Sequence, residues 1–203
     1  MKALPLISLL FLSLSLAAQD AIQTAPRHEF SFLLGMAKHS GAPAERFCNA
    51  FWCDEQVTQG DGHAVSTGLA YHYLFPAGPI WVGGGGSFEL MGNTRYERLA
   101  SLTGVVEYRT GRRRVRPVLR LEAGAALPIG AGRRSIYDRS VGPLLHPSVG
   151  LLIATGAQRG HEILVTAGYR FTDAGFFTVN WLGQPVEREI NYRRLTLTLA
   201  SRF

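Results

Sequence analysis

The last stretch of the chain, residues 193–203, alternates between two kinds of side chain. After Arg193, its odd positions carry three leucines, a serine and the terminal Phe203, and its even positions carry Arg194, two threonines, an alanine and Arg202. A period of two is typical of a β-strand with one apolar and one polar face. The stretch therefore predicts a strand, and the same test can be applied to the rest of the chain.

Seven further segments show the same alternation and predict strands over residues 28–38, 65–75, 80–90, 101–109, 117–127, 148–154 and 163–172. The second, fourth and sixth connections between these strands are short, whereas the first, fifth and seventh are long, covering about 39–63, 130–146 and 173–189. The third connection is also brief and breaks the rule. Short and long connections in turn are typical of an up-and-down membrane barrel. The fold class we predict is all-β, an eight-stranded antiparallel up-and-down transmembrane β-barrel.

The placement of charge separates a membrane barrel from a soluble one. Within the central span of every predicted strand, one face carries no charged residue. The opposite faces carry Glu89, Glu107, Arg109, Arg120, Glu122, Arg170, Arg194 and Arg202. A soluble barrel would turn its charges toward water and keep its interior apolar. A lipid-embedded barrel needs the reverse, and its closed sheet satisfies every backbone group.

These inward charges predict a paired network. The interior of an eight-stranded barrel is only wide enough to be filled by its own side chains. Glu107 should lie nearly opposite Arg120 on the neighbouring strand. Unpaired buried charge is costly, so we expect ion pairs that plug the barrel, with the surplus arginines shared with hydroxyls such as Thr196 and Thr198. The alternative is a conducting pathway.

The first residues predict export. Lys2 precedes an almost wholly apolar stretch over 4–16, and Ala17 and Ala18 supply small residues for cleavage. This is the pattern of a secretory signal peptide, and the stretch is too short to span a membrane as a helix. We expect a cleaved signal over 1–18, a short periplasmic leader over 19–27 and the barrel over 28–203.

An exported chain favours a disulfide between its two cysteines, Cys48 and Cys53. Two cysteines without nearby paired histidines make a poor zinc site, so we expect neither a metal nor a cofactor. Phe47, Phe51 and Trp52 surround the pair. Held in a tight external loop, these aromatic side chains would suit the binding of an extracellular partner. The alternative is that they pack on the loop itself or rest on the membrane surface.

The architecture resembles the small eight-stranded outer-membrane barrels of the OmpA/OmpX type over everything after the signal. The C-terminal pattern ending in Phe203 looks like the signal read by the barrel assembly machinery, although Ser201 stands where that family often has an aromatic residue. The resemblance implies a monomer in the outer membrane of a Gram-negative bacterium, with both termini periplasmic. It also implies contact with outer-membrane lipid and lipopolysaccharide. Such a fold hosts several functions, so none follows from it.

The segment His146-Pro147-Ser148 is similar to the His-x-Ser of the outer-membrane lipid A deacylase family. A hydrolase needs a base beside its nucleophile and an acid that orients the base, and Asp173 across the hairpin could be that acid. However, Val149 follows the serine where that family usually has Asn. The alternation also points His146 and Ser148 inward, away from lipid.

Two further motifs have simple explanations. The glycine run 83–86 lacks the GxxxxGK[ST] ending and the following helix of a phosphate loop, so small residues inside a narrow barrel or at a bend are its expected use. Four arginines at 112, 113, 114 and 116 form a basic turn. This turn either contacts phospholipid phosphates or is merely solvated, and nucleic acid is excluded by the compartment.

The expected function is that of a non-enzymatic small barrel protein with a structural or surface-interaction role through its external loops. The first alternative is a lipid-modifying enzyme of the outer membrane, and the second is a narrow solute channel.

Overall fold

The computed structural model describes residues 25–37, 44–48, 53–57, 64–91, 98–110, 114–130, 136–155, 160–179 and 185–203. The predicted signal peptide, most of the predicted leader, and Phe51 and Trp52 therefore lie outside the described residues. Within them, no helix is long and apolar enough to cross a membrane.

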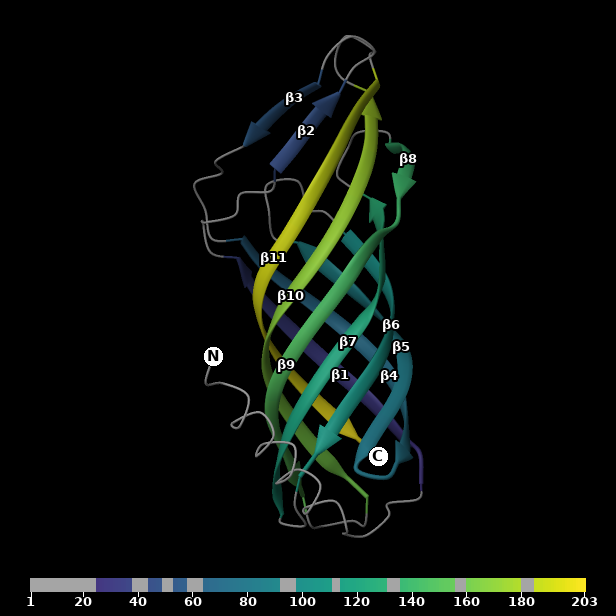
Figure 1. Cartoon of the computed structure of the whole chain (residues 1–203), viewed down its shortest axis with the longest axis vertical. Coiled ribbons are helices and arrows are strands. Elements are labelled where there is room, and N and C mark those ends of the chain that lie inside the picture. Colours follow the sequence, from purple (N-terminus) through teal and green to yellow (C-terminus); the bar gives the residue numbers. More distant parts are fainter. Residues whose placement is uncertain are drawn as a thin grey trace, which may run out of the picture.

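Eight strands close into a barrel (Figure 1). They are β1 (Arg27–Ala37), β4 (Ala64–Ala77), β5 (Ile80–Met91), β6 (Arg98–Arg109), β7 (Val115–Gly130), β9 (Gly142–Ala154), β10 (Glu162–Val179) and β11 (Pro185–Arg202). Each pairs antiparallel with the next along the chain, and β11 returns to pair with β1 from Glu29↔Arg202 to Met36↔Leu195. The prediction of an eight-stranded antiparallel up-and-down barrel is confirmed.

The first and last strands lock together at the end of the barrel where the short connections lie. The backbone amide of His28 donates to the carbonyl of Phe203 at 2.9 Å, and the amide of Phe203 donates to the carbonyl of His28 at 3.1 Å. The ring of Phe203 stacks on Phe30 with 5.9 Å between centroids. Gly78, with a φ of 68°, makes the tight β4–β5 turn at the same end. We call this the short-turn end.

Three extra strands lie at the opposite end, in segments where the alternation predicts loops. They are β2 (Ala44–Cys48), β3 (Cys53–Val57) and β8 (Ile136–Ser140). The expectation of long loops over 39–63, 130–146 and 173–189 was wrong in these parts. Backbone pairing of β10 with β11 continues to Val179↔Pro185. The resulting ribbon rises beyond the barrel (Figure 1) and offers its two edges to β2 and β8.

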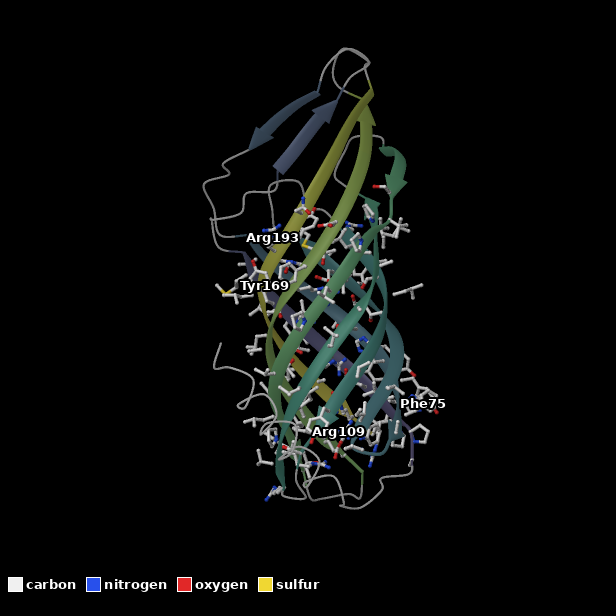
Figure 2. All side chains as sticks on the ribbon, viewed as in Figure 1. Phe75, Arg109, Tyr169 and Arg193 are labelled. Atoms are coloured by element: carbon white, nitrogen blue, oxygen red, sulfur yellow. The ribbon has the colours of Figure 1, made fainter. Side chains whose placement is uncertain are left out.

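The two faces of the barrel wall have inverted polarity. Large apolar side chains point outward and are exposed, reaching 77% at Leu102, 65% at Leu69 and 60% at Leu195. Side chains project from both faces of the wall along its whole height (Figure 2). The inward positions hold buried serines, threonines, histidines, glutamates and arginines. A globular protein in water would bury the first set and expose the second.

Candidate functional site

The candidate functional site is the interior of the barrel. All eight charged side chains that the alternation places inside are buried, the most exposed being Arg109 at 8%. They come from five different strands and meet in ion pairs inside the barrel. The sequence does not determine which glutamate pairs with which arginine.

Three ion pairs run straight across the barrel, and we call them the cross-barrel pairs. Arg120–Glu29 joins β7 to β1, Arg202–Glu107 joins β11 to β6, and Arg170–Glu89 joins β10 to β5. In a ring of eight strands, each of these pairs connects strands that lie four places apart. The side chains therefore bridge the full width of the interior.

Arg202 and Glu107 form the tightest of these contacts. Nη1 and Nη2 of Arg202 donate to Oε1 and Oε2 of Glu107 at 2.7 and 2.5 Å, and Nε of Arg202 donates to Oε2 of Glu29 at 2.6 Å. Arg109 adds a third guanidinium, with Nε donating to Oε1 of Glu107 at 2.6 Å. Two parallel bonds from one guanidinium to one carboxylate fix direction as well as distance. Glu107 is thus the acceptor on which this end of the network converges.

Arg120 links three carboxylates. It donates to Glu29 at 2.9 Å through Nη1 and to Glu122 at 2.8 Å through Nε. Glu107 lies directly opposite Arg120 in the β6–β7 register, as the sequence analysis expects, but their contact is longer, at 3.3 Å. The adjacent pair is therefore a secondary contact, because each partner makes shorter bonds to other strands.

Glu89 is the acceptor toward the opposite end. Its Oε1 forms an ion pair with Nη2 of Arg170 at 2.5 Å, and its Oε2 accepts a hydrogen bond from Nη1 of Arg194 at 2.7 Å. Arg170 also donates to Ser87 at 3.1 Å, and Arg194 donates to Ser66 at 2.8 Å. Arginines are shared with hydroxyls as expected, but these hydroxyls belong to serines.

The two threonines named for that role from the sequence do something else. Thr196 Oγ1 lies 2.7 Å from Nε2 of His146. Thr198 Oγ1 has no hydrogen-bond partner among the described residues. The expectation for these two hydroxyls was wrong because strand parity fixes the face of a side chain but not its height relative to an arginine on another strand.

Four further buried residues join the network: Glu29, His72, His146 and Glu162. The sequence analysis placed His146 inside the barrel, but as a catalytic candidate and not as a member of the network. Glu29 and Glu162 lie near strand ends, outside the central spans in which charges were counted. With them, the described interior has five buried glutamates against five buried arginines. Strand alternation could have found Glu29 and Glu162, because it places both side chains on the inward face of their strands.

The two histidines form clusters of the same composition. Nδ1 of His72 lies 3.2 Å from Glu29 and Nε2 lies 3.1 Å from Thr103 Oγ1. Nδ1 of His146 lies 3.3 Å from Glu122, and its Nε2 contacts Thr196. Each imidazole thus joins a carboxylate to a threonine hydroxyl.

The two clusters also occupy equivalent strands. In each consecutive set of four barrel strands, the glutamate is on the first, the histidine on the second and the threonine on the fourth. The third strand carries a glycine beneath each ring. A Cβ on Gly85 would lie 2.7 Å from Cδ2 of His72, and a Cβ on Gly168 would lie 2.9 Å from Nε2 of His146. The interior is therefore built from two similar halves.

The structure does not bring the candidate catalytic residues together. The ring nitrogens of His146 contact Glu122 and Thr196, and Ser148 Oγ has no hydrogen-bond partner in the described part of the chain. Asp173 is exposed, while both His146 and Ser148 are buried in the interior. His146 also lies within β9, which begins at Gly142 rather than near Ser148. Among the described residues, no base forms a hydrogen bond with the serine, which is the contact that activates a serine nucleophile.

Cys48 and Cys53 are direct backbone partners across the β2–β3 hairpin. Cα atoms of directly opposed antiparallel residues lie about 4.5–5.5 Å apart, within the range that disulfides span. Phe47 pairs with Asp54 in the same hairpin. The disulfide stays a prediction, and a non-reduced digest that yields two free thiols would reject it. Among described residues, no group of three or more His, Cys, Asp or Glu side chains could hold a metal ion.

No family model and no curated protein matches this sequence. Among solved structures, the chain is similar to the crystal structure of Neisserial surface protein A (NspA), at 13% identity and a TM-score of 0.49, covering 88% of this chain and 97% of that one. It is also similar to the solid-state NMR structure of outer membrane protein AlkL in DMPC lipid bilayers, at 13% identity and a TM-score of 0.46, covering 92% and 93%. The fold of this chain rests on its own strand pairing, and the resemblance to small eight-stranded outer-membrane barrels is confirmed at that level.

Proposed function

We propose that this protein is a non-enzymatic integral protein of the bacterial outer membrane, inserted after cleavage of its signal peptide. The observation that supports this most is the inverted polarity of the wall. A charged side chain facing lipid at mid-membrane costs about 2–4 kcal/mol, and the outward positions at mid-height carry leucine, valine, phenylalanine and alanine instead. Aromatic side chains gather near both rims, as at membrane interfaces.

In this proposal, the functional surface is the end of the barrel that carries the extended β10–β11 ribbon. The short-turn end faces the periplasm, so the β10–β11 ribbon with β2, β3 and β8 projects outside the cell. These strands extend the sheet beyond the height that a bilayer needs, because a spanning strand requires only about 9–11 residues and β10 and β11 have 18 each. A structural or surface-interaction role through this region follows.

Epitope tags placed at the two ends test the proposed orientation. A tag within 180–184, between β10 and β11, should bind antibody on intact cells. The matched tag within 111–113, between β6 and β7, should bind only after permeabilisation. Exposure of the 111–113 tag on intact cells would overturn the orientation. On detergent gels, unboiled protein should also migrate differently from boiled protein. Unchanged migration would contradict a folded barrel, on which the membrane proposal depends.

The cross-barrel pairs favour a closed interior over a channel. Three ion pairs span the ring, and an eight-stranded barrel has no width to spare. In planar bilayers the unmodified protein should therefore give no steady conductance after insertion. Sustained conductance steps from protein that also shows the heat-dependent gel shift would contradict this and promote the channel alternative.

Analysis of lipid A distinguishes the enzyme alternative from the proposed non-enzymatic role. The interior holds no assembled nucleophile, base and acid among the residues described. Mass spectra of lipid A from cells with and without the protein should therefore be the same. A mass change that depends on the protein would replace this proposal with a lipid-modifying activity.

A further inference from the structure

Two arginines face each other on the inner wall, toward the end of the barrel that carries the β10–β11 ribbon. Arg170 and Arg194 are direct partners in the β10–β11 register, and they are only 1% and 2% exposed. Both guanidinium groups contact the same carboxylate, that of Glu89, at 2.5 and 2.7 Å. Like charges directly opposite each other on neighbouring strands destabilise a sheet. The pair therefore needs counter-charge, and Glu89 supplies one unit of it.

The positive surplus is local to this pair. In the rest of the network, four arginines meet four glutamates, namely Arg109, Arg116, Arg120 and Arg202 with Glu29, Glu107, Glu122 and Glu162. Glu122 lies 3.6 Å from Nη1 of Arg170 but 2.8 Å from Nε of Arg120, so its charge is already shared. Among the described residues, one positive charge at Arg170 and Arg194 is therefore left without a counter-charge.

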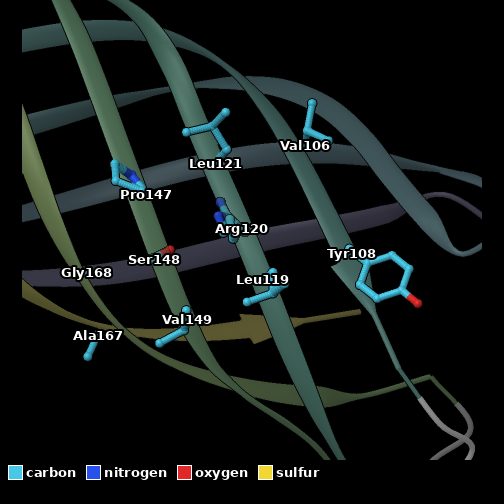
Figure 3. Close-up of a pocket in the computed structure, with 10 residues that line it drawn as sticks. All are labelled: Val106, Tyr108, Leu119, Arg120, Leu121, Pro147, Ser148, Val149, Ala167 and Gly168. Carbon is cyan, nitrogen blue, oxygen red and sulfur yellow. The ribbon is translucent and has the colours of Figure 1, made fainter. Parts of the chain in front are cut away.

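The same two arginines carry unused hydrogen-bond donors. For comparison, Arg120, which points from β7 into the interior (Figure 3), contacts carboxylates with all three of its guanidinium nitrogens. Arg194 uses only Nη1, which donates to Glu89 and to Ser66. Its Nε and Nη2, and the Nε of Arg170, have no hydrogen-bond partner among the described residues. Because a buried donor without a partner is costly, an acceptor is expected beside them.

The unused atoms of Arg194 form a fork, since the N–H groups of Nε and Nη2 lie side by side on one edge of the planar guanidinium. Thr172 adds a hydroxyl on the same inward face. It is 1% exposed, lies two residues from Arg170 on β10, and its Oγ1 has no hydrogen-bond partner in the described part of the chain. Unpartnered donors on adjoining strands, beside a surplus positive charge, are the features of an anion site. The narrow interior of an eight-stranded barrel requires that this anion be small.

We propose that the barrel interior holds one chloride ion between Arg170 and Arg194, with the hydroxyl of Thr172 as a further donor. A single uncompensated charge calls for a monovalent anion. Water would satisfy the donors but would leave the two guanidinium groups with one counter-charge. The site depends on the folded barrel and not on the proposed surface role. Because only the folded state brings β10 and β11 together, chloride should stabilise that state by mass action.

Urea unfolding of the purified barrel in detergent tests this, with free chloride varied from about 1 to about 500 mM. Gluconate, which is too large for the interior, replaces chloride so that the ionic strength stays constant. The folding equilibrium constant of the unmodified protein should rise about tenfold for each tenfold increase in chloride above the dissociation constant, as one bound ion requires. Arg194→Gln removes the fork and the surplus charge and should abolish this dependence. Arg109→Gln removes a buried arginine from the balanced part of the network and should retain it.

Thr172→Val gives a second test if Arg194→Gln does not fold, because it keeps the size of the side chain and every charge. Loss of one donor to an ion should weaken chloride binding about tenfold. Thr198→Val is its matched control and should leave chloride binding unchanged, because it removes another buried hydroxyl without a partner among the described residues, four residues from Arg194 on β11.

Three results would overturn the proposal. Stability of the unmodified protein that does not change with chloride would mean that water fills the site. Equal chloride dependence in Arg194→Gln and Arg109→Gln would reveal a general effect of salt. Equal chloride affinity in Thr172→Val and Thr198→Val would remove the ion from its place beside Arg170 and Arg194.

Discussion

Replacing Glu107 by alanine is expected to lower the free energy of unfolding of the barrel by about 3–5 kcal/mol. The side chain is fully buried and accepts from Arg202 at 2.7 and 2.5 Å and from Arg109 at 2.6 Å. Its removal leaves guanidinium groups without their main counter-charge in the buried interior. An uncompensated buried charge costs far more than the pair contributed.

A second substitution should recover part of this loss. When Arg202→Ala is added to Glu107→Ala, the double variant should be more stable than the sum of the two single losses predicts. Arg120→Ala added to Glu107→Ala should show weaker coupling, because that contact measures 3.3 Å. Residues in one ion-pair network couple by about 0.5–3 kcal/mol, so the difference between the two cycles is measurable.

Urea unfolding in lipid or detergent measures these free energies of unfolding. The fraction of folded protein is read from its different migration on unboiled gels. Arg193→Ala is the matched control, because Arg193 is exposed on β11 near the rim (Figure 2). Its effect should stay within about 0.5 kcal/mol. If Glu107→Ala were as mild as this control, the interior would not depend on the network. A larger coupling to Arg120 than to Arg202 would reject the cross-barrel arrangement.

The faces of the strands could be predicted because alternation alone determines them. Arg194, Thr196 and Arg202 share one face of β11 whatever the register of its neighbours, and the same holds on every strand. Only closure in a membrane explains an uncharged face on all eight segments. The barrel and its buried charges therefore follow from one strand at a time.

The partners of these charges could not be predicted in the same way. Glu107 and Arg120 are neighbours across one hairpin, so local geometry suggests that they pair. The shorter bonds of Glu107 go to Arg202 across the ring, and that distance depends on the combined stagger of all eight strands. The part that the histidines play in the network was not predicted for another reason, since His72 and His146 are formally neutral and a count of charges passes over them.

The strands beyond the barrel were missed because the rule that reveals strands fails there. Period-two alternation is enforced where one face meets lipid and the other a packed interior. Past Asp173, β10 and β11 continue as a ribbon above that zone, and their backbone pairing continues to Val179↔Pro185. Hydrogen bonding of the ladder needs no particular side-chain pattern, so the sequence 174–190 gives little sign of it.

Replacing Gly85 by alanine is expected to destabilise the barrel through one added methyl group. A Cβ at this inward position would overlap the carbonyl oxygen of Tyr71 and lie 2.7 Å from Cδ2 of His72. Strand β4 would have to move away from β5, and the His72 ring would lose its 3.1 Å contact with Thr103. Forcing an extra methyl into a packed interior costs about 1–3 kcal/mol, and the loss of the histidine's partner adds to this.

Gly84→Ala is the matched control, one residue away on the opposite face. A Cβ there would meet only the carbonyl oxygen of Thr103, at 3.5 Å, and would point toward lipid. Because alanine has less backbone freedom to lose on folding than glycine, this variant should be neutral or more stable by up to about 1 kcal/mol. Unfolding in urea of both variants side by side decides the point. Equal stabilities would mean that β4 and β5 do not approach as closely as the contact between Gly85 and Tyr71 requires.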